Sequence, residues 1–254
     1  MCILFIARNC HPDYPLIICA NRDEFHHRAT APMHRWPGPE GIVAGQDLKA
    51  GGTWLGFNQQ GEIAALTNIR DLNTTQDDRL SRGELVLKAL KGEIDEHWLL
   101  QHSDSYNPFN LLYQQGRELY VFNSRNTTNT LLTDGFHAVS NGDLDDIWPK
   151  MAKGKQVLEQ VISNHHQLSP ENLLPIMADE SQPDDNCLPD TGVSKEWERR
   201  LSSIFIRHPE YGTRSTNIII THQHGLLQCL EARYHPNGKV LSTDSFTTAF
   251  QSDE

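Results

Sequence analysis

Two short apolar runs near the N-terminus place the strongest constraint on the fold. Residues 3–7 read Ile-Leu-Phe-Ile-Ala, and residues 16–20 read Leu-Ile-Ile-Cys-Ala. Apolar, β-branched runs of about four to eight residues are typical of buried strands and are too short for an ordinary helix. The intervening residues 9–15 include Asn, Asp and two prolines, which favour a turn. The pattern predicts a β-hairpin, so the rest of the chain has to pack around a sheet.

The second run ends in charged residues, where a buried strand would be expected to stay apolar. Asn21, Arg22, Asp23 and Glu24 follow it directly, and antiparallel pairing returns them alongside Cys2. Because side chains alternate along a strand, Asn21 and Asp23 share one face and Arg22 lies on the other. We therefore expect a carboxylate and a guanidinium close to Cys2.

Cys2 directly follows the initiator methionine, and its small side chain permits removal of Met1. Removal would place a thiol and a free α-amine on one residue. Reference pKa values are about 8.5 for cysteine and about 7.7–8.0 for an α-amine, so the amine can act as the base that activates the thiol. The alternative is that Cys2 is a small buried hydrophobe on a strand. The polar residues that return to Cys2 favour the catalytic interpretation.

Composition excludes several classes of protein. The chain has 254 residues, 37% of them hydrophobic, and a net charge of −11, which disfavours binding to nucleic acid or to anionic membranes. No apolar run approaches the roughly 18 residues of a membrane-spanning helix, and the basic segment of a signal peptide is missing. The five cysteines are an odd number without CxxC spacing, which fits a reducing compartment. We expect a cytoplasmic protein without membrane insertion, with an organelle as the alternative location.

The remaining pattern predicts strands and helices in blocks. Residues 28–41 contain three prolines and are predicted to form a loop, and the acidic residues 179–192 a mobile one. Predicted strands are 41–47, 51–58, 62–68, 109–113, 118–122, 130–133, 137–141, 215–221, 226–234 and 240–250, with Asp134-Gly135 as the turn between two of them. Predicted helices are 81–91 with Ser81 as N-cap, 95–101, 150–165, one opening at Ser169-Pro170, and 195–205. Blocks of strands and helices without βαβ alternation predict an α+β fold of two antiparallel sheets between helices, in one domain covering 1–254.

The sequence predicts neither a metal nor a cofactor. It has thirteen histidines but no HExxH motif and no Cys/His cluster. It also lacks phosphate-binding glycine loops and the GxSxG motif of serine hydrolases. Gly51 and Gly52 have two interpretations: they form a turn, which we favour, or they let the backbone approach a ligand near Cys2.

Three further residues are candidates with open alternatives. Asn68 and Asn141 each end a strand-like run, where a side-chain amide can hold a developing oxyanion or simply terminate the strand. Arg214 precedes an apolar strand and either binds a substrate carboxylate or pairs with a surface acid.

An ordered set of motifs resembles a known family. The motifs are Cys2, Asn-Arg-Asp-Glu-Phe at 21–25, Gly-Gly-Thr-Trp-Leu-Gly at 51–56, Ala-Ala-Leu-Thr-Asn at 64–68, Arg-Gly-Glu-Leu at 82–85, Phe-Asn-Leu at 109–111, Ser-Asn at 140–141, Trp148 and Tyr-Gly-Thr-Arg at 211–214. The chain resembles the NRDE family, also called the transport and Golgi organisation 2 family. That family is similar to the N-terminal-nucleophile amidohydrolases that include penicillin V acylases and bile salt hydrolases. The resemblance implies a four-layer αββα fold.

The resemblance also implies roles for individual residues. Cys2 would be the nucleophile with its own α-amine as base, and Asp23 would bind that amine. Asn68, in the segment 58–68, would supply an oxyanion donor, and Asn141 matches the second active-site asparagine.

One position departs from the acylase pattern. Those enzymes carry an arginine three residues before the aspartate, where this chain has Ala20. Arg22 has the same strand parity as Ala20 and could supply the guanidinium on the same face. Asn21, Trp54 and Arg214 complete the candidates, as substrate contacts.

These observations leave two functional hypotheses. The first is an N-terminal cysteine hydrolase that cleaves a non-peptide C–N amide or a related acyl bond of a small molecule. The second is a binding or carrier protein with the same fold that holds a hydrophobic ligand such as haem or an acyl lipid. A homodimer formed through the sheets is left open.

Overall fold

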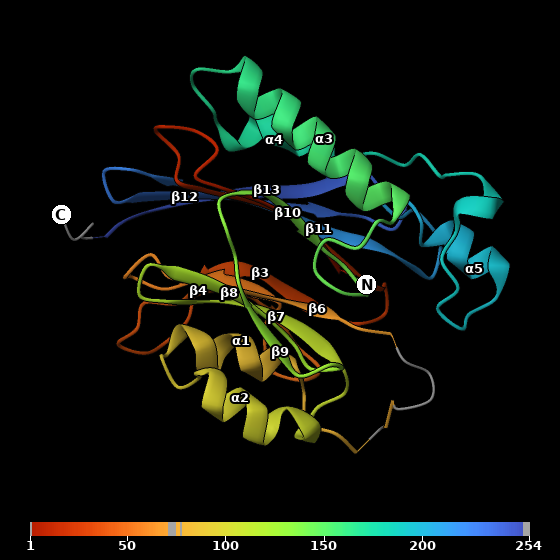
Figure 1. Cartoon of the computed structure of the whole chain (residues 1–254), viewed down its shortest axis with the longest axis horizontal. Helices are drawn as coiled ribbons and strands as arrows, with labels where there is room; N and C mark the ends of the chain where they lie inside the picture. The colour runs from red at the N-terminus through yellow and green to blue at the C-terminus, as the bar shows by residue number, and fades with distance from the viewer. Residues whose placement is uncertain (1, 71–74, 77, 251–254) are drawn as a thin grey trace.

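Two antiparallel sheets stack face to face, and each carries helices on its outer side (Figure 1). A computed structural model describes residues 2–70, 75–76 and 78–250. The first sheet has the order β10-β1-β2-β11-β12-β13. Its strands are β1 (Cys2–Arg8), β2 (Leu16–Phe25), β10 (Gly135–Val139), β11 (Tyr211–His222), β12 (Leu226–Tyr234) and β13 (Val240–Ala249).

The second sheet runs in chain order from β3 to β9. Its strands are β3 (Thr30–Arg35), β4 (Val43–Asp47), β5 (Leu55–Phe57), β6 (Ile63–Asn68), β7 (Phe109–Gln115), β8 (Glu118–Asn123) and β9 (Thr128–Leu131).

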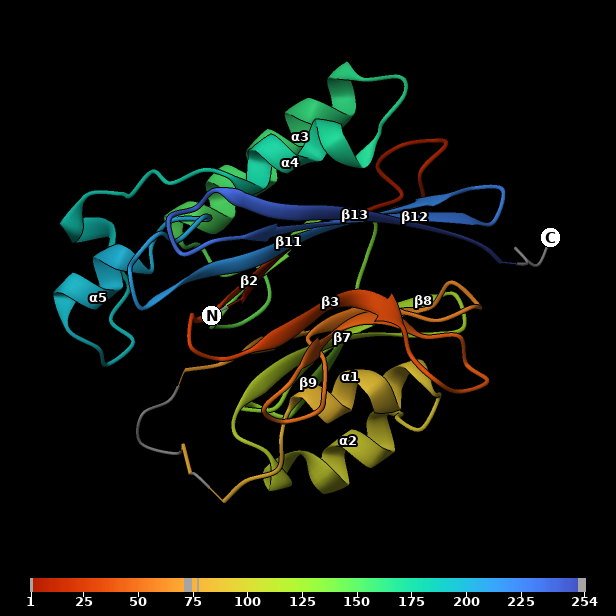
Figure 2. The ribbon, with the colours of Figure 1, turned by 180° about the vertical axis from the view of Figure 1, so that it is seen from behind.

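The helices form the two outer layers. Helices α3 (Pro149–Asn164) and α4 (Pro170–Met177) cover the first sheet, and α1 (Gly83–Leu90) and α2 (Glu96–His102) lie on the second (Figure 2). Helix α5 (Lys195–Arg200) lies at the same end as the N-terminus, opposite the end where β13 leads to the C-terminus. This confirms the predicted four-layer αββα arrangement. Within the described residues, no helix combines the length and apolar character needed to cross a membrane.

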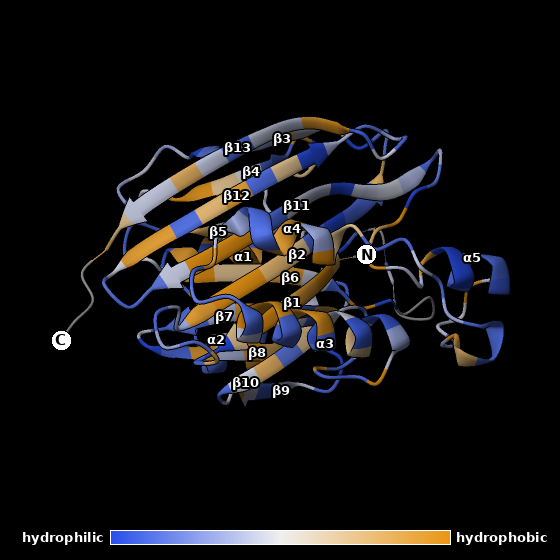
Figure 3. Ribbon diagram, turned by 90° about the horizontal axis from the view of Figure 1, so that it is seen from above, coloured by the Kyte–Doolittle hydropathy of each residue, from blue (hydrophilic) through white to orange (hydrophobic). Residues whose placement is uncertain are grey.

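The first apolar run is uninterrupted because both faces of β1 are buried. Leu4 and Ile6 belong to the core between the sheets, whereas Ile3 and Phe5 pack toward α3. A strand covered on both sides needs apolar residues at every position rather than at alternate ones. Figure 3 shows the hydrophobic residues concentrated along the central strands of the sandwich.

The predicted loop at 28–41 is wrong in its first half. Residues Thr30–Arg35 form β3, which pairs antiparallel with β4. Pro32 is tolerated because β3 is an edge strand and its register shifts between Ala31 and His34. The prolines therefore marked an edge of the sheet as well as a loop.

The predicted turn at 134–135 does not join two neighbouring strands. Strand β9 pairs with β8 in the second sheet, whereas β10 pairs with β1 in the first. The chain therefore crosses from one sheet to the other at this point. This crossing delivers residues 140 and 141, which follow β10 directly, to the end of β1 that begins with Cys2.

Other boundaries moved by a few residues. Helix α1 has Arg82 as its N-cap instead of Ser81, and α5 ends at Arg200 instead of reaching residue 205. Of the predicted strand 51–58, only Leu55–Phe57 pairs. The other predicted helices are confirmed to within about a residue where both ends were predicted.

Candidate active site

The predicted N-terminal hairpin is confirmed, and its register brings the charged residues to Cys2. Cys2 lies directly opposite Arg22, and Ile3 lies opposite Asn21. Cys2, Arg22 and Asp23 are all buried, with 8%, 5% and 4% of their surface exposed. The thiol, a guanidinium and a carboxylate therefore meet at one end of the first sheet.

Burial sets the protonation state of the Cys2 thiol. Removal from water raises its pKa, and the negative charge of Asp23 adds to this shift. Arg22 and the backbone N–H of Asp23 act in the opposite direction, because they stabilise the thiolate. The thiol thus needs a base to become nucleophilic at neutral pH.

Asp23 is held by strand β11. Thr213 Oγ1 donates to Asp23 Oδ1 at 2.6 Å, and Tyr211 Oη donates to the Asp23 carbonyl oxygen at 3.1 Å. Burial raises the pKa of Asp23, while the Thr213 hydrogen bond and the charges of Lys150 and Arg22 lower it. A register shift in β11 between residues 213 and 215 marks this contact as an irregular point in the sheet.

The two candidate asparagines meet on the other side of Cys2. Ser140 Oγ donates to the Cys2 carbonyl oxygen at 3.0 Å, and Asn141 Nδ2 donates to the Asn68 carbonyl oxygen at 2.5 Å. The side-chain amide of Asn68 makes no hydrogen bond within the described part of the chain. Residues 73 positions apart are thus joined next to the candidate nucleophile.

A buried asparagine on β7 fixes the segment that carries Asn141. Asn110 Nδ2 donates to the carbonyl oxygens of Ser140 at 3.2 Å and Gly142 at 2.8 Å, and contacts Thr67 Oγ1 at 3.1 Å. Thr67 Oγ1 in turn donates to the Ser140 carbonyl oxygen at 2.6 Å. The second sheet therefore holds residues 140–142 in place against β1.

Arg22 points into the space between the sheets. Its guanidinium lies 4.5 Å above the ring of Trp54, 3.5 Å from Asp47 and 3.8 Å from Glu24. Ala20 also belongs to the core between the sheets. The prediction that Ala20 and Arg22 share one face is thus confirmed.

Asn21 lies on the opposite face, and its polar atoms are occupied. Its Nδ2 donates to the carbonyl oxygens of Met177 and Ile204, both at 2.9 Å, and its Oδ1 accepts from Thr216 Oγ1 at 2.6 Å. These bonds tie the sheet to the end of α4 and to the segment after α5. The Asn21 amide is therefore engaged in structural contacts and is not proposed as a substrate contact.

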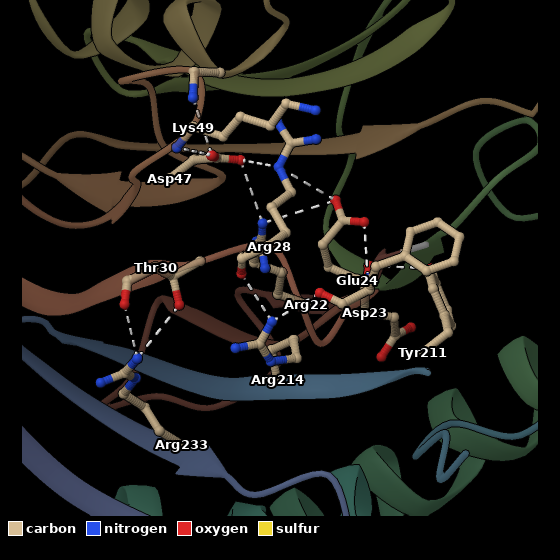
Figure 4. A network of polar contacts seen from close by, with 12 residues as sticks. Arg22, Asp23, Glu24, Arg28, Thr30, Asp47, Lys49, Tyr211, Arg214 and Arg233 are labelled. Atoms are coloured by element: carbon tan, nitrogen blue, oxygen red, sulfur yellow. Dashed lines mark hydrogen bonds and ion pairs between the residues drawn. The ribbon is translucent and has the colours of Figure 1, made fainter. Parts of the chain in front are cut away.

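The other two candidate substrate contacts face the space between the sheets or its edge. Trp54 Nε1 donates to Asn217 Oδ1 at 3.4 Å. Arg214 Nη1 donates to the carbonyl oxygens of Phe25 at 2.9 Å and Arg28 at 3.0 Å (Figure 4). Within the described residues Arg214 forms no ion pair with a surface acid, so binding of a substrate carboxylate stays a prediction for this residue.

Two basic residues near Cys2 were missed by sequence reasoning. Lys150 is buried, its Nζ donates to the Leu201 carbonyl oxygen at 2.9 Å, and burial lowers its pKa to about 8. Arg82 lies within electrostatic reach of Cys2, and its Nη1 donates to the Pro108 carbonyl oxygen at 3.0 Å. Arg82 stands in a recognised motif, but Lys150 is an ordinary polar position of an amphipathic helix and carries no sequence signal.

The backbone conformation and packing around Gly51 and Gly52 explain why glycine occupies these two positions. Thr53 N donates to the Gly83 carbonyl oxygen at 3.0 Å, and a Cβ on Gly52 would overlap the backbone of Gly83. Gly51 has a φ of +79°, as a turn requires. Gly51 thus serves the turn, and Gly52 allows a tight contact with the start of α1, the helix that Arg82 precedes. Among the described residues, no three His, Cys, Asp or Glu side chains are grouped so as to hold a metal ion.

Comparison with known proteins identifies the family. The family model described as "Transport and Golgi organisation 2" matches residues 1–236. The chain belongs to this family. The Transport and Golgi organization protein 2 homolog of Bos taurus is 30% identical over 249 residues, covering 89% of this chain and 90% of the relative. Transport and Golgi organization protein 2 of Drosophila melanogaster is 24% identical, covering 91% of each chain.

Solved structures with a similar arrangement include two hydrolases. One is a C2A mutant of the conjugated bile acid hydrolase from Clostridium perfringens, with a TM-score of 0.48, 8% identity, and coverage of 100% of this chain and 99% of that one. The other is the Caenorhabditis elegans ortholog of N-acylethanolamine-hydrolyzing acid amidase, with a TM-score of 0.44, 9% identity, and coverage of 86% and 92%. With TM-scores below 0.5, these matches do not bear on the chemistry of this chain.

Proposed function

We propose that the protein is an N-terminal cysteine hydrolase that cleaves a C–N amide or a related acyl bond of a small molecule after removal of Met1. The observation that carries the proposal is the convergence on Cys2. Its thiol lies beside Asp23 and opposite Arg22. The contact between Asn68 and Asn141 lies close to Cys2, because Ser140, the neighbour of Asn141, donates to the Cys2 carbonyl oxygen. Nucleophile, electrostatic support and amide donors are thus within one end of the sandwich.

The reaction would begin with proton transfer from the thiol to the α-amine of Cys2. The thiolate attacks the carbonyl carbon, a C–S bond forms, and the carbonyl oxygen becomes an oxyanion held by amide N–H groups. The C–N bond then breaks, and the α-ammonium returns its proton to the leaving nitrogen. Water, deprotonated by the α-amine, attacks the thioester, breaks the C–S bond and releases the acid, and the thiol is restored.

The surroundings suit these steps. The pKa of the thiol is raised by burial, so an adjacent base is needed to deprotonate it. Arg22 then stabilises the thiolate that forms. Asp23, supported by Thr213, can hold the α-ammonium. Asn68 has an uncommitted side-chain amide in the described structure, and Asn141 uses only one of its two amide N–H groups. We assign these two asparagines to the oxyanion.

The test compares the processed protein with two cysteine variants. Intact mass first establishes whether Met1 has been removed. Turnover is then measured on a panel of N-acyl amino acids, N-acyl amines and acyl thioesters for the parent, for Cys2→Ala and for Cys19→Ala. Cys19 is the matched control, because it is buried on the same hairpin but packs toward the helices. We expect Cys2→Ala to lose all turnover and Cys19→Ala to keep it; equal turnover by Cys2→Ala and the parent refutes the proposal.

A second candidate, binding without hydrolysis, is favoured by Ala20. The position of the acylase arginine is occupied here by an apolar residue of the core between the sheets. A cavity of about 1090 Å³ lies at the other end of β1, lined by Arg8, Leu16, Gln59, His222 and Phe250 among others. Arg8 is six strand steps from Cys2, which corresponds to about 20 Å. Titration of protein that retains Met1 with haem and with a fatty acid tests this candidate, and the absence of binding to either counts against it.

A further inference from the structure

Three buried polar atoms on the inner face of the first sheet have no hydrogen-bond partner among the described residues. They are Arg22 Nη1, Ser215 Oγ and Glu231 Oε1, and these residues are 5%, 3% and 0% exposed. Buried polar groups are almost always paired, so three unpaired atoms facing one region indicate a place where something else binds.

The three residues belong to adjacent strands of the first sheet. Cys2 pairs with Arg22, Arg22 with Ser215, and Ser215 with Arg233. Residues directly opposite one another on neighbouring strands point to the same side of the sheet, and strands are about 4.8 Å apart. This row of side chains therefore starts at the thiol, and Ser215 stands about 10 Å from Cys2, two strand spacings away.

Two arginines at the start of the row share two carboxylates. Arg22 lies 3.5 Å from Asp47 and 3.8 Å from Glu24, and Arg28 lies 2.6 Å from Asp47 and 3.8 Å from Glu24. Their charges are thus balanced within the protein, as Figure 4 shows. Arg22 Nη1 is nevertheless left without a partner.

Two further arginines add positive charge without a carboxylate partner. Arg214 donates to backbone carbonyl oxygens, and Arg233 donates to the carbonyl oxygen and hydroxyl of Thr30 at 3.0 and 3.3 Å. Neither forms an ion pair among the described residues. A local excess of positive charge beside Cys2, in a chain with a net charge of −11, favours a negatively charged ligand.

Glu231 faces the same space two residue pairs further along, opposite Asn217 on β11 and Asp244 on β13. Its Oε2 accepts from the Met33 backbone N–H at 2.7 Å. Burial raises the pKa of this carboxyl, while the Met33 N–H and the charge of Arg233 act against that shift. Glu231 is thus held by β3 outside the row, two residues from Arg233 along β12.

We propose that the row binds a carboxylate on the amine half of the substrate, so that the protein acts on N-acyl amino acids. The inference rests on the proposed function. The carboxylate accepts from Arg22 Nη1 and Ser215 Oγ, and Arg214 supplies further positive charge. Because the row begins at Cys2, the anion lies within two strand spacings of the thiol. That position suits a carboxylate a few bonds from the scissile nitrogen, and not an anion at the far end of a long acyl chain.

Binding to the Cys2→Ala protein tests the site without requiring hydrolysis. Titration calorimetry compares N-octanoylglycine with N-octanoylglycinamide, which has the same shape and no charge. We expect the acid to bind about tenfold or more tightly, since a hydrogen bond to a charged group is worth roughly one factor of ten or more. Adding Ser215→Ala or Arg214→Gln is expected to weaken binding of the acid about tenfold and to leave the amide unchanged. Arg207→Gln is the control, because this exposed arginine pairs with Glu180 away from the row.

The outcomes separate this inference from the proposed function. Equal affinity for acid and amide, or no binding of either, overturns the carboxylate site. Acid binding that Ser215→Ala and Arg214→Gln leave unchanged places the anion elsewhere and overturns it as well. In a separate assay, the parent protein is tested for cleavage of both compounds. Equal cleavage of the acid and the amide supports the hydrolase proposal and overturns the carboxylate site. If the protein binds the acid in preference to the amide but shows no Cys2-dependent turnover, the carboxylate site is supported and the hydrolase proposal is refuted.

Discussion

The hydrogen bond from Thr213 to Asp23 allows a quantitative test of how the site is held. Thr213→Val keeps the side-chain shape and removes the hydroxyl that donates to Asp23 Oδ1 at 2.6 Å. The same hydroxyl accepts from the backbone N–H of Ile206 at 2.9 Å, so the variant also leaves that donor unpaired. Both partners are buried, and water cannot replace the lost bonds.

The sign of the pH dependence follows from the pKa of Asp23. Burial raises this pKa above its unfolded value, so the stability associated with the protonated form is lost as the pH rises through the folded pKa. The Thr213 bond offsets part of that loss, because it is stronger with a carboxylate than with a neutral acid. Removing the bond therefore costs more free energy of unfolding at neutral pH than at acidic pH.

The magnitude comes from typical hydrogen-bond energies. A bond to a charged group contributes about 1.5–3 kcal/mol, against about 1 kcal/mol for a neutral pair. We expect the loss in free energy of unfolding to grow by about 1–2 kcal/mol from acidic to neutral pH, equivalent to roughly one unit in the pKa of Asp23. The unpaired Ile206 N–H adds a further cost that is independent of pH.

Urea denaturation across this pH range measures the effect. Thr221→Val is the matched control: Thr221 lies on the same strand, is buried, and its hydroxyl bonds only to the backbone of Leu16. Its cost should not change with pH. If Thr213→Val shows the same constant loss as Thr221→Val, the hydrogen bond does not stabilise the Asp23 carboxylate, and the reasoning about this residue fails.

Three other variants test how the parts of the site are supported. Asn110→Ala removes the donor that holds residues 140–142, and should lower the free energy of unfolding by about 2–4 kcal/mol in urea denaturation. Lys150→Met removes an amine whose pKa burial lowers to about 8; the parent should gain stability relative to the variant as the pH rises from neutral through this value, and a constant difference would contradict the assignment. Gly154→Ala places a Cβ against the buried ring of Phe5, and should lower the melting temperature despite the better helix propensity of alanine; an unchanged or higher value would show that the contact relaxes easily.

Much of the site's first half could be predicted because its contacts are local. The two apolar runs and the turn between them specify a hairpin, and antiparallel pairing then returns residues 21–24 to Cys2. The alternation of side chains correctly placed Arg22 on the face shared with Ala20 and Asn21 on the other. The sequence could not show that the side-chain amide of Asn21 is engaged in a hydrogen bond that joins the sheet to the end of α4.

The other half of the site depends on long-range pairing. Side-chain alternation indicates which face a residue occupies, but not which sheet its strand joins. The turn after residue 133 was therefore assigned to a hairpin, although β9 and β10 lie in different sheets and this crossing brings Asn141 to Asn68. Thr213, Lys150 and Ser215 reach the site from distant parts of the chain through tertiary packing. The sequence by itself determined the local hairpin and its two faces, because a short turn leaves few other pairings; only the tertiary structure decided which distant side chains surround Cys2, because that depends on how the two sheets stack.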